Sequence, residues 1–100
     1  MALVLVVDDD RSIRHMVSRS LEKINLRVET AATAQEGLEL VSRSQPDVVL
    51  LDITLPGRSG LDVLRDIQAI DRRLPVIFIT VDSGTGTAIE AMQLGAYDYV

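Results

Sequence analysis

Residues 5–10 read LVVDDD, an apolar strand that runs directly into three adjacent aspartates. Two ionised carboxylates about 4 Å apart repel each other by about 4 kcal/mol at an effective protein dielectric of about 20. A small domain tolerates this repulsion only where another group offsets it. Any fold for this chain must therefore place a compensating charge beside these carboxylates.

Short apolar runs alternate along the chain with segments of helical period, which is typical of βαβ units. The expected strands are residues 3–7, 27–32, 47–52, 75–80 and 96–100. The expected helices carry apolar residues three or four apart: Ile13, Met16, Val17, Leu21 and Ile24; Ala34, Leu38 and Val41; Leu61, Leu64, Ile67 and Ile70; and Ala88, Ile89 and Met92 before Gly95. The unbroken runs in 47–52 and 75–80 predict central strands that are covered on both faces.

Composition excludes several classes of protein. The chain has 100 residues, 47% of them hydrophobic, which fits one globular domain. A net charge of −5 argues against direct nucleic-acid binding and favours a cation or a basic partner. No cysteine occurs, so thiolate metal sites are excluded. The apolar start MALVLVV is too short to cross a bilayer, so we expect no membrane partner.

Right-handed crossovers between these strands predict an α/β fold, a flavodoxin-like, doubly wound parallel sheet with strand order 2-1-3-4-5. Such folds bind ligands beyond the carboxyl ends of their strands. Those ends carry Asp8, Asp9 and Asp10 after the first strand, Asp52 after the third and Thr80 after the fourth. A hard divalent cation, which prefers carboxylate, carbonyl and water oxygens, would offset the repulsion there.

Over its whole length the chain resembles the receiver domain of two-component response regulators. The acidic pair matches Asp8 and Asp9, the phosphoacceptor matches Asp52 in LLDITLPGRSG, the hydroxyl matches Thr80 in IFITVDSG, and the switch aromatic matches Tyr99 in GAYDYV. The spacings from Asp9 through Asp52 and Thr80 to Tyr99 are 43, 28 and 19 residues. Within the family, DDDRSIR and TAIEAMQLGAYDYV are most similar to receivers of nitrogen-regulation-type (sigma-54 activator) regulators.

The resemblance implies a site and its chemistry. Asp52 would accept a phosphoryl group from a sensor histidine kinase, with Mg²⁺, or Mn²⁺ as the alternative ion. The metal ligands would be Asp8, Asp9, Asp52 and the backbone carbonyl of Thr54. Thr80 would contact the phosphate and Tyr99 would respond to it, changing the face formed by the fourth helix and fifth strand.

The resemblance also implies a biological setting. It describes a cytoplasmic signalling domain that is not an enzyme, beyond catalysing its own phosphorylation and dephosphorylation. Its phosphorylation would switch a downstream effector of transcriptional type, with a DNA-binding or ATPase output. Self-association through the face of the fourth helix and fifth strand is expected.

Family receivers continue beyond the DY of the fifth strand with a Lys-Pro pair and a fifth helix, whereas the sequence given ends at Val100. The expectation is therefore a receiver domain over residues 1–100 that is incomplete at its C-terminus, with the last helix missing. Apolar surface on one face of the first and fifth strands would then stay uncovered, which favours self-association.

Plainer interpretations remain open for each residue. The aspartates at 8–10 could only cap the first helix, where Asp is favoured, and we expect one of them to do so beside a metal site. Asp52 could open a turn, Thr80 could end a strand, and Tyr99 could be a core aromatic.

Two other classes of function also stay open. The first is a Mg²⁺-dependent hydrolase of the haloacid-dehalogenase type, since VVLLDIT places an aspartate at a strand end. In such enzymes a second acid stands two residues later, where this chain has Thr54. The second is a pseudo-receiver, which binds partners without being phosphorylated.

Overall fold

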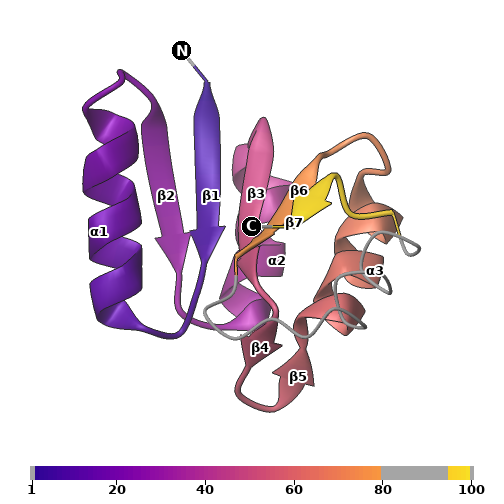
Figure 1. The fold of residues 1–100 in the computed structure, drawn as a ribbon. Helices are drawn as coiled ribbons and strands as arrows, with labels where there is room; N and C mark the ends of the chain where they lie inside the picture. The colour runs from indigo at the N-terminus through magenta and orange to yellow at the C-terminus, as the bar shows by residue number, and fades with distance from the viewer. Residues whose placement is uncertain (1, 80–94, 100) are drawn as a thin grey trace.

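The computed structural model describes residues 2–79 and 95–99, which form a five-stranded parallel sheet flanked by helices (Figure 1). The elements are β1 (Leu3–Val7), α1 (Arg11–Glu22), β2 (Arg27–Ala31), α2 (Ala34–Ser44), β3 (Val48–Asp52), β4 (Thr54–Leu55), β5 (Arg58–Ser59), α3 (Gly60–Ile70), β6 (Val76–Ile79) and β7 (Asp98–Tyr99). The order β2-β1-β3-β6-β7 confirms the predicted doubly wound sheet. Thr80 and the predicted fourth helix around Ala88 lie outside the described residues.

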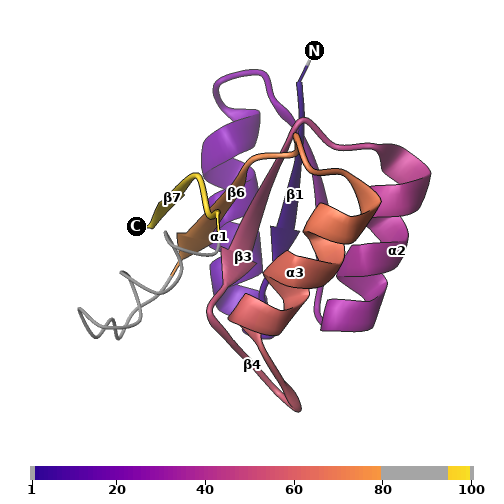
Figure 2. The same cartoon turned by 90° about the vertical axis from the view of Figure 1, so that its right-hand side faces the viewer.

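The core lies between the sheet and the two helices α2 and α3, which Figure 2 shows together on one side of the strands. Alternate residues of the central strands point into it, because side chains of a strand alternate between its two faces. Residues of this layer that are at most 1% exposed include Leu5, Val49, Leu51, Val63, Leu64, Ile67, Val76 and Phe78. This apolar layer holds β1, β3 and β6 in one rigid platform.

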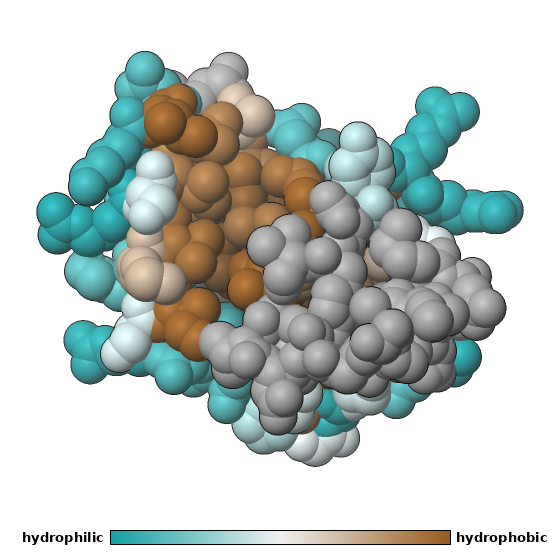
Figure 3. Space-filling view, viewed as in Figure 1, coloured by the Kyte–Doolittle hydropathy of each residue, from teal (hydrophilic) through white to brown (hydrophobic). Residues whose placement is uncertain are grey.

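The opposite face of the sheet is less well covered than the apolar runs predicted. Val48, Leu50, Ile77 and Ile79 alternate with the core residues and remain partly exposed. Helix α1, the one described helix on this side, packs against β1 and β2. A hydrophobic surface is therefore visible over the central strands in Figure 3. Coverage of this face of β3 and β6 by the predicted fourth helix lies outside the described residues.

Helix α1 is amphipathic, but its apolar stripe is narrower than its spacing predicted. No α1 residue is fully buried, and Met16 is 60% exposed. Ile24 lies beyond the end of the helix at Glu22 and is 66% exposed. The helix therefore contacts the sheet mainly through half-buried residues such as Ile13 and Val17.

Helix α2 has a defined cap at each end. The Thr33 hydroxyl accepts a hydrogen bond from the Glu36 N–H at 3.1 Å, which is one half of a capping box. Gln45 ends the helix in the left-handed conformation, with φ of 50°, directly before Pro46. None of the described helices is both long and apolar enough to cross a membrane.

A short hairpin follows β3. Strands β4 and β5 pair antiparallel, Thr54 with Ser59 and Leu55 with Arg58. The turn between them holds Gly57 at φ of 76°, a conformation that favours glycine. The hairpin therefore begins two residues after Asp52 and lies beside the carboxyl edge of the sheet.

Candidate functional site

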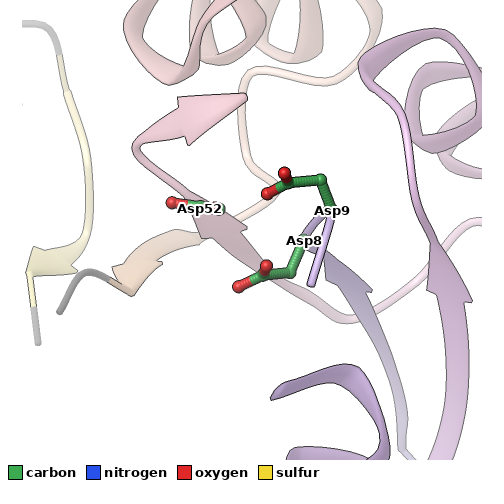
Figure 4. Close-up of side chains that lie close together, drawn as sticks. All are labelled: Asp8, Asp9 and Asp52. Atoms are coloured by element: carbon green, nitrogen blue, oxygen red, sulfur yellow. The ribbon is translucent and has the colours of Figure 1, made fainter. Parts of the chain in front are cut away.

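Three carboxylates gather at the carboxyl edge of the sheet. Asp8 and Asp9 follow β1, and Asp52 is the last residue of β3, the strand that pairs with β1. One oxygen from each lies within 4.8 Å of the others. Figure 4 shows the Asp8 and Asp9 side chains near the end of the strand that carries Asp52. Sequence-distant acids thus share one small region because their strands are neighbours.

Hydrogen bonds fix the backbone of Asp8. Its N–H donates to the Ala31 carbonyl at 3.1 Å, which continues the pairing of β1 with β2. Its Oδ1 accepts from the Asp10 N–H at 2.9 Å, and its carbonyl accepts from the Arg14 guanidinium at 2.8 Å. The residue is only 2% exposed. Asp8 is therefore the buried, rigid member of the cluster, whereas Asp9 is exposed.

Asp10, the third aspartate of the run, caps helix α1. Its Oδ1 accepts from the backbone N–H groups of Ser12 and Ile13 at 2.8 and 3.2 Å, so it is the N-cap of α1. This confirms the expectation that one of the three aspartates caps the first helix. The other two acids are left for the cluster with Asp52.

The Asp52 side chain is oriented by the hairpin that follows it. Its Oδ1 accepts a hydrogen bond from the Thr54 N–H at 3.0 Å. The hairpin is tied to α3 by an ion pair between Arg58 and Asp66 at 2.6 Å and by the Gly60 N–H, which donates to the Ile53 carbonyl at 2.8 Å. Thr54, the predicted carbonyl ligand, is therefore adjacent to the carboxylate cluster.

The electrostatics of the cluster are those of uncompensated negative charge. The pKa of Asp52 is raised from 3.8 to about 6, mainly by burial, with the charges of Asp8 and Asp9 adding to the rise and the hydrogen bond from Thr54 opposing it. Burial likewise raises the pKa of Asp8 above its usual value, with Asp9 and Asp10 adding to the effect and Arg14 opposing it. Both carboxyls would favour ionisation if a cation lay among them.

The donor set fits a hard divalent cation. Three carboxylates offer oxygen ligands from a rigid sheet edge, and Mg²⁺ takes oxygen ligands in small numbers while keeping several waters. Among the described residues, the structure brings together Asp8, Asp9 and Asp52, with Thr54 next to them. It places the Tyr99 backbone in β7, paired with Phe78.

Three residues of this region were not identified from the sequence: Arg14, which donates to the Asp8 carbonyl; Ser59, which caps α3; and Gly60, whose N–H donates to the carbonyl of Ile53, next to Asp52. Ser59 could have been found, because Ser59 and Asp62 match the spacing of a capping box. No periodic pattern or motif distinguishes Arg14 or Gly60, because each contact joins a helix residue to the irregular segment before that helix.

Comparisons with known proteins place the chain in a family. It is 42% identical over 98 residues to the DNA-binding transcriptional regulator NtrC of Escherichia coli K12, covering 98% of this chain but 21% of NtrC. Among solved structures, the chemotaxis protein CheY4 of Vibrio cholerae is 30% identical with a TM-score of 0.93, covering 100% of this chain and 85% of that one. The BeF3-activated N-terminal receiver domain of Klebsiella pneumoniae RstA is 28% identical with a TM-score of 0.92, covering 98% and 83%.

These similarities agree with the architecture of the sheet and with the likeness to nitrogen-regulation-type regulators that the sequence motifs predicted. They also favour a receiver over the haloacid-dehalogenase alternative. The family model described as the response regulator receiver domain matches residues 4–100. The chain therefore belongs to the receiver domain family of two-component response regulators.

Proposed function

We propose that this receiver domain accepts a phosphoryl group on Asp52 in a site that holds Mg²⁺, or Mn²⁺ in its place. The observation that carries the proposal is the cluster of Asp8, Asp9 and Asp52, whose oxygens lie within 4.8 Å of one another at the sheet edge. Activation of the similar RstA receiver by BeF3 supports a phosphoryl site in this fold. The domain is a signalling module whose catalysis is limited to its own phosphorylation and dephosphorylation.

Asp52 is the nucleophile in this proposal. The Thr54 N–H holds Oδ1 at 3.0 Å, and Oδ2 forms the new bond to phosphorus. The bond from phosphorus to the imidazole nitrogen of the donor phosphohistidine breaks, and the leaving imidazole takes a proton from solvent. When bound, the metal supplies positive charge that neutralises the phosphoryl oxygens. Asp8, Asp9 and Asp52 would hold the metal together with the backbone carbonyl of Thr54.

The partners follow from this chemistry. A sensor histidine kinase supplies the phosphoryl group in the cytoplasm, and an effector responds to it. The similar NtrC is a DNA-binding transcriptional regulator of which this chain spans 21%, which supports an effector of transcriptional type. Thr80 contacts the phosphate and Tyr99 responds to it, so that a local change biases a two-state surface.

Self-association is the last part of the proposal. Val48, Leu50, Ile77 and Ile79 leave apolar surface partly exposed over the central strands (Figure 3). An apolar surface of this kind favours contact with another molecule. We propose that self-association occurs through the predicted face of the fourth helix and fifth strand.

Intact-mass spectrometry tests the phosphoacceptor. The wild-type chain and the Asp52→Asn variant are treated with acetyl phosphate and Mg²⁺, and the mass added by one phosphoryl group is expected for the wild type alone. Asp47→Asn is the matched control, because Asp47 lies just before β3 at the opposite edge of the sheet. There its side chain accepts a hydrogen bond from the Leu3 N–H. Equal labelling of wild type and Asp52→Asn would rule out Asp52, and no labelling of the wild type would favour the pseudo-receiver.

A further inference from the structure

The backbone beside Asp52 is approached very closely by Gly60, the first residue of α3. A Cβ atom on Gly60 would lie 2.6 Å from the Asp52 carbonyl oxygen, 2.8 Å from the Ile53 Cα and 2.9 Å from the Ile53 carbonyl oxygen. Cβ atoms do not approach other heavy atoms to within 3.0 Å. All three contacts are backbone atoms, so no side-chain rotation could relieve them.

The same residue is also bonded to that segment. The Gly60 N–H donates to the Ile53 carbonyl at 2.8 Å, while the neighbouring Ser59 pairs with Thr54 across the hairpin. The hairpin is held against α3 by the Arg58–Asp66 ion pair at 2.6 Å. The start of α3 therefore sets the position of the backbone between Asp52 and Thr54.

The need for glycine at position 60 is a need for space rather than for an unusual backbone. Gly57 and Gly95 adopt positive φ, and Gly60 is not among the residues that do. Replacing glycine by alanine in a helix normally stabilises the protein or leaves its stability unchanged. For Gly60→Ala, helix propensity therefore predicts a stabilised protein, whereas the steric contacts of the added Cβ predict a destabilised one.

We propose that Gly60 is a positioning residue for the phosphoacceptor site, because its lack of a side chain lets α3 hold the Asp52 carboxylate and the Thr54 carbonyl in place. A side chain at 60 would push the Asp52–Ile53 backbone away by a few tenths of an ångström. Mg²⁺ demands near-ideal octahedral geometry, so a small displacement of its ligands weakens binding. This inference rests on the proposed metal site.

Calorimetric titration with Mg²⁺ compares the wild type with Gly60→Ala and Gly57→Ala. Gly60→Ala should bind Mg²⁺ about tenfold more weakly, given the strong dependence of such sites on ligand placement. Gly57→Ala is the matched control: Gly57 lies in the hairpin just before Gly60, and alanine is strained at its φ of 76°, but the added Cβ would meet nothing within 4 Å. It should lose stability yet bind Mg²⁺ within about twofold of wild type.

A metal-free measurement separates positioning from general destabilisation. The amide resonance of Thr54 reports its hydrogen bond to Asp52 Oδ1. In Gly60→Ala this resonance should shift in the absence of metal, whereas resonances of α1 should not. In Gly57→Ala the Thr54 resonance should move less.

A second pair of variants keeps the test decisive if Gly60→Ala does not fold. Asp66→Asn removes the partner of Arg58 and loosens the hairpin on α3, and it should weaken Mg²⁺ binding about threefold, as expected for a partly exposed pair. Asp62→Asn makes the same charge change on the same helix, where Asp62 pairs with Arg65 outside the hairpin, and should bind like wild type.

The outcomes distinguish the inference from the function beneath it. Failure of the wild type to bind Mg²⁺ would overturn the proposed metal site. Wild-type binding together with unchanged affinity in Gly60→Ala would overturn the positioning role alone. If Gly60→Ala is unfolded, equal affinities of Asp66→Asn and Asp62→Asn would overturn it.

Discussion

Leu51 and Asp8 are both almost completely buried, at 0% and 2% exposure, yet their burial has opposite consequences. Leu51 packs in the apolar layer between the sheet and helices α2 and α3, where removal of its surface from water stabilises the fold. Asp8 lies at the carboxyl edge, where burial opposes its charge and raises its pKa. The apolar interior therefore stabilises the folded protein, whereas the buried carboxylates at the sheet edge destabilise it.

The largest expected effect comes from the interior. Phe78 on β6 is 0% exposed. Phe78→Ala should destabilise the protein by about 3–5 kcal/mol, because it leaves a cavity between the sheet and the helices. Urea unfolding of the metal-free protein measures the loss. Ile77→Ala, on the opposite face of the same strand and partly exposed, should cost clearly less. Equal losses would mean that both faces are packed alike.

At the acidic edge of the sheet, bound metal should offset the repulsion among the carboxylates. Mg²⁺ at a hundred times its dissociation constant should stabilise the folded protein by about 2.7 kcal/mol, because it binds only the assembled site. Asp9→Ala removes an exposed member of the cluster and should abolish the gain. Asp71→Ala removes an exposed carboxylate at the end of α3 and should keep it. Melting curves with and without Mg²⁺ decide the matter, and a full response in Asp9→Ala would contradict the ligand assignment.

The destabilisation caused by the buried Asp52 carboxylate should depend on pH in a defined direction. The pKa of Asp52 is raised from 3.8 to about 6 in the folded state. Its contribution to stability is therefore fully present below pH 3.8 and is lost as the pH rises through about 6. Without metal, Asp52→Asn should be the more stable protein at neutral pH by about 1 kcal/mol, since solvent screens a half-buried carboxylate.

Unfolding of both proteins across this pH range checks the sign. The stability difference in favour of Asp52→Asn should grow from acid to neutral pH and should be removed by Mg²⁺, which binds the wild-type carboxylate. A difference that shrinks as the pH rises would show that the Asp52 charge is already compensated in the folded protein.

The smallest effect on stability is expected on the open face of the sheet. Ile77→Thr keeps a β-branched side chain at a partly exposed strand position and should cost less than about 1 kcal/mol. If the apolar surface in Figure 3 contributes to self-association, the same change should weaken it in sedimentation velocity. Exposed Met16→Thr on α1 is the comparison. Unaltered association in Ile77→Thr would assign the contact to another surface.

The sequence predicted most of the sheet because its signals are local. Apolar runs identified β1, β3 and β6, and the strand-end position of Asp8 and Asp52 then predicted their meeting. The coverage of the sheet was not predictable in the same way. Leu50 and Leu51 are the same residue type in one apolar run, yet Leu50 is partly exposed and Leu51 is buried, because α2 and α3 cover only the face that carries Leu51.

The supporting contacts of the site escaped prediction for a related reason. The approach of Gly60 to Asp52 joins residues on either side of a hairpin, and the bond from Arg14 to the Asp8 carbonyl joins a helix to the loop before it. Neither leaves a periodic pattern in the sequence. The hairpin itself had a signal in Pro56 and Gly57, which a loop and a two-residue turn share.

The capping role of Asp10 makes the three aspartates unequal under mutation. Its carboxylate serves two N–H groups of α1, and serine, threonine or asparagine can accept the same bonds. Asp8 and Asp9 contribute charge to the cluster with Asp52, which none of these residues can supply. An engineered receiver could therefore carry serine, threonine or asparagine at position 10 and still keep the three-carboxylate cluster of Asp8, Asp9 and Asp52.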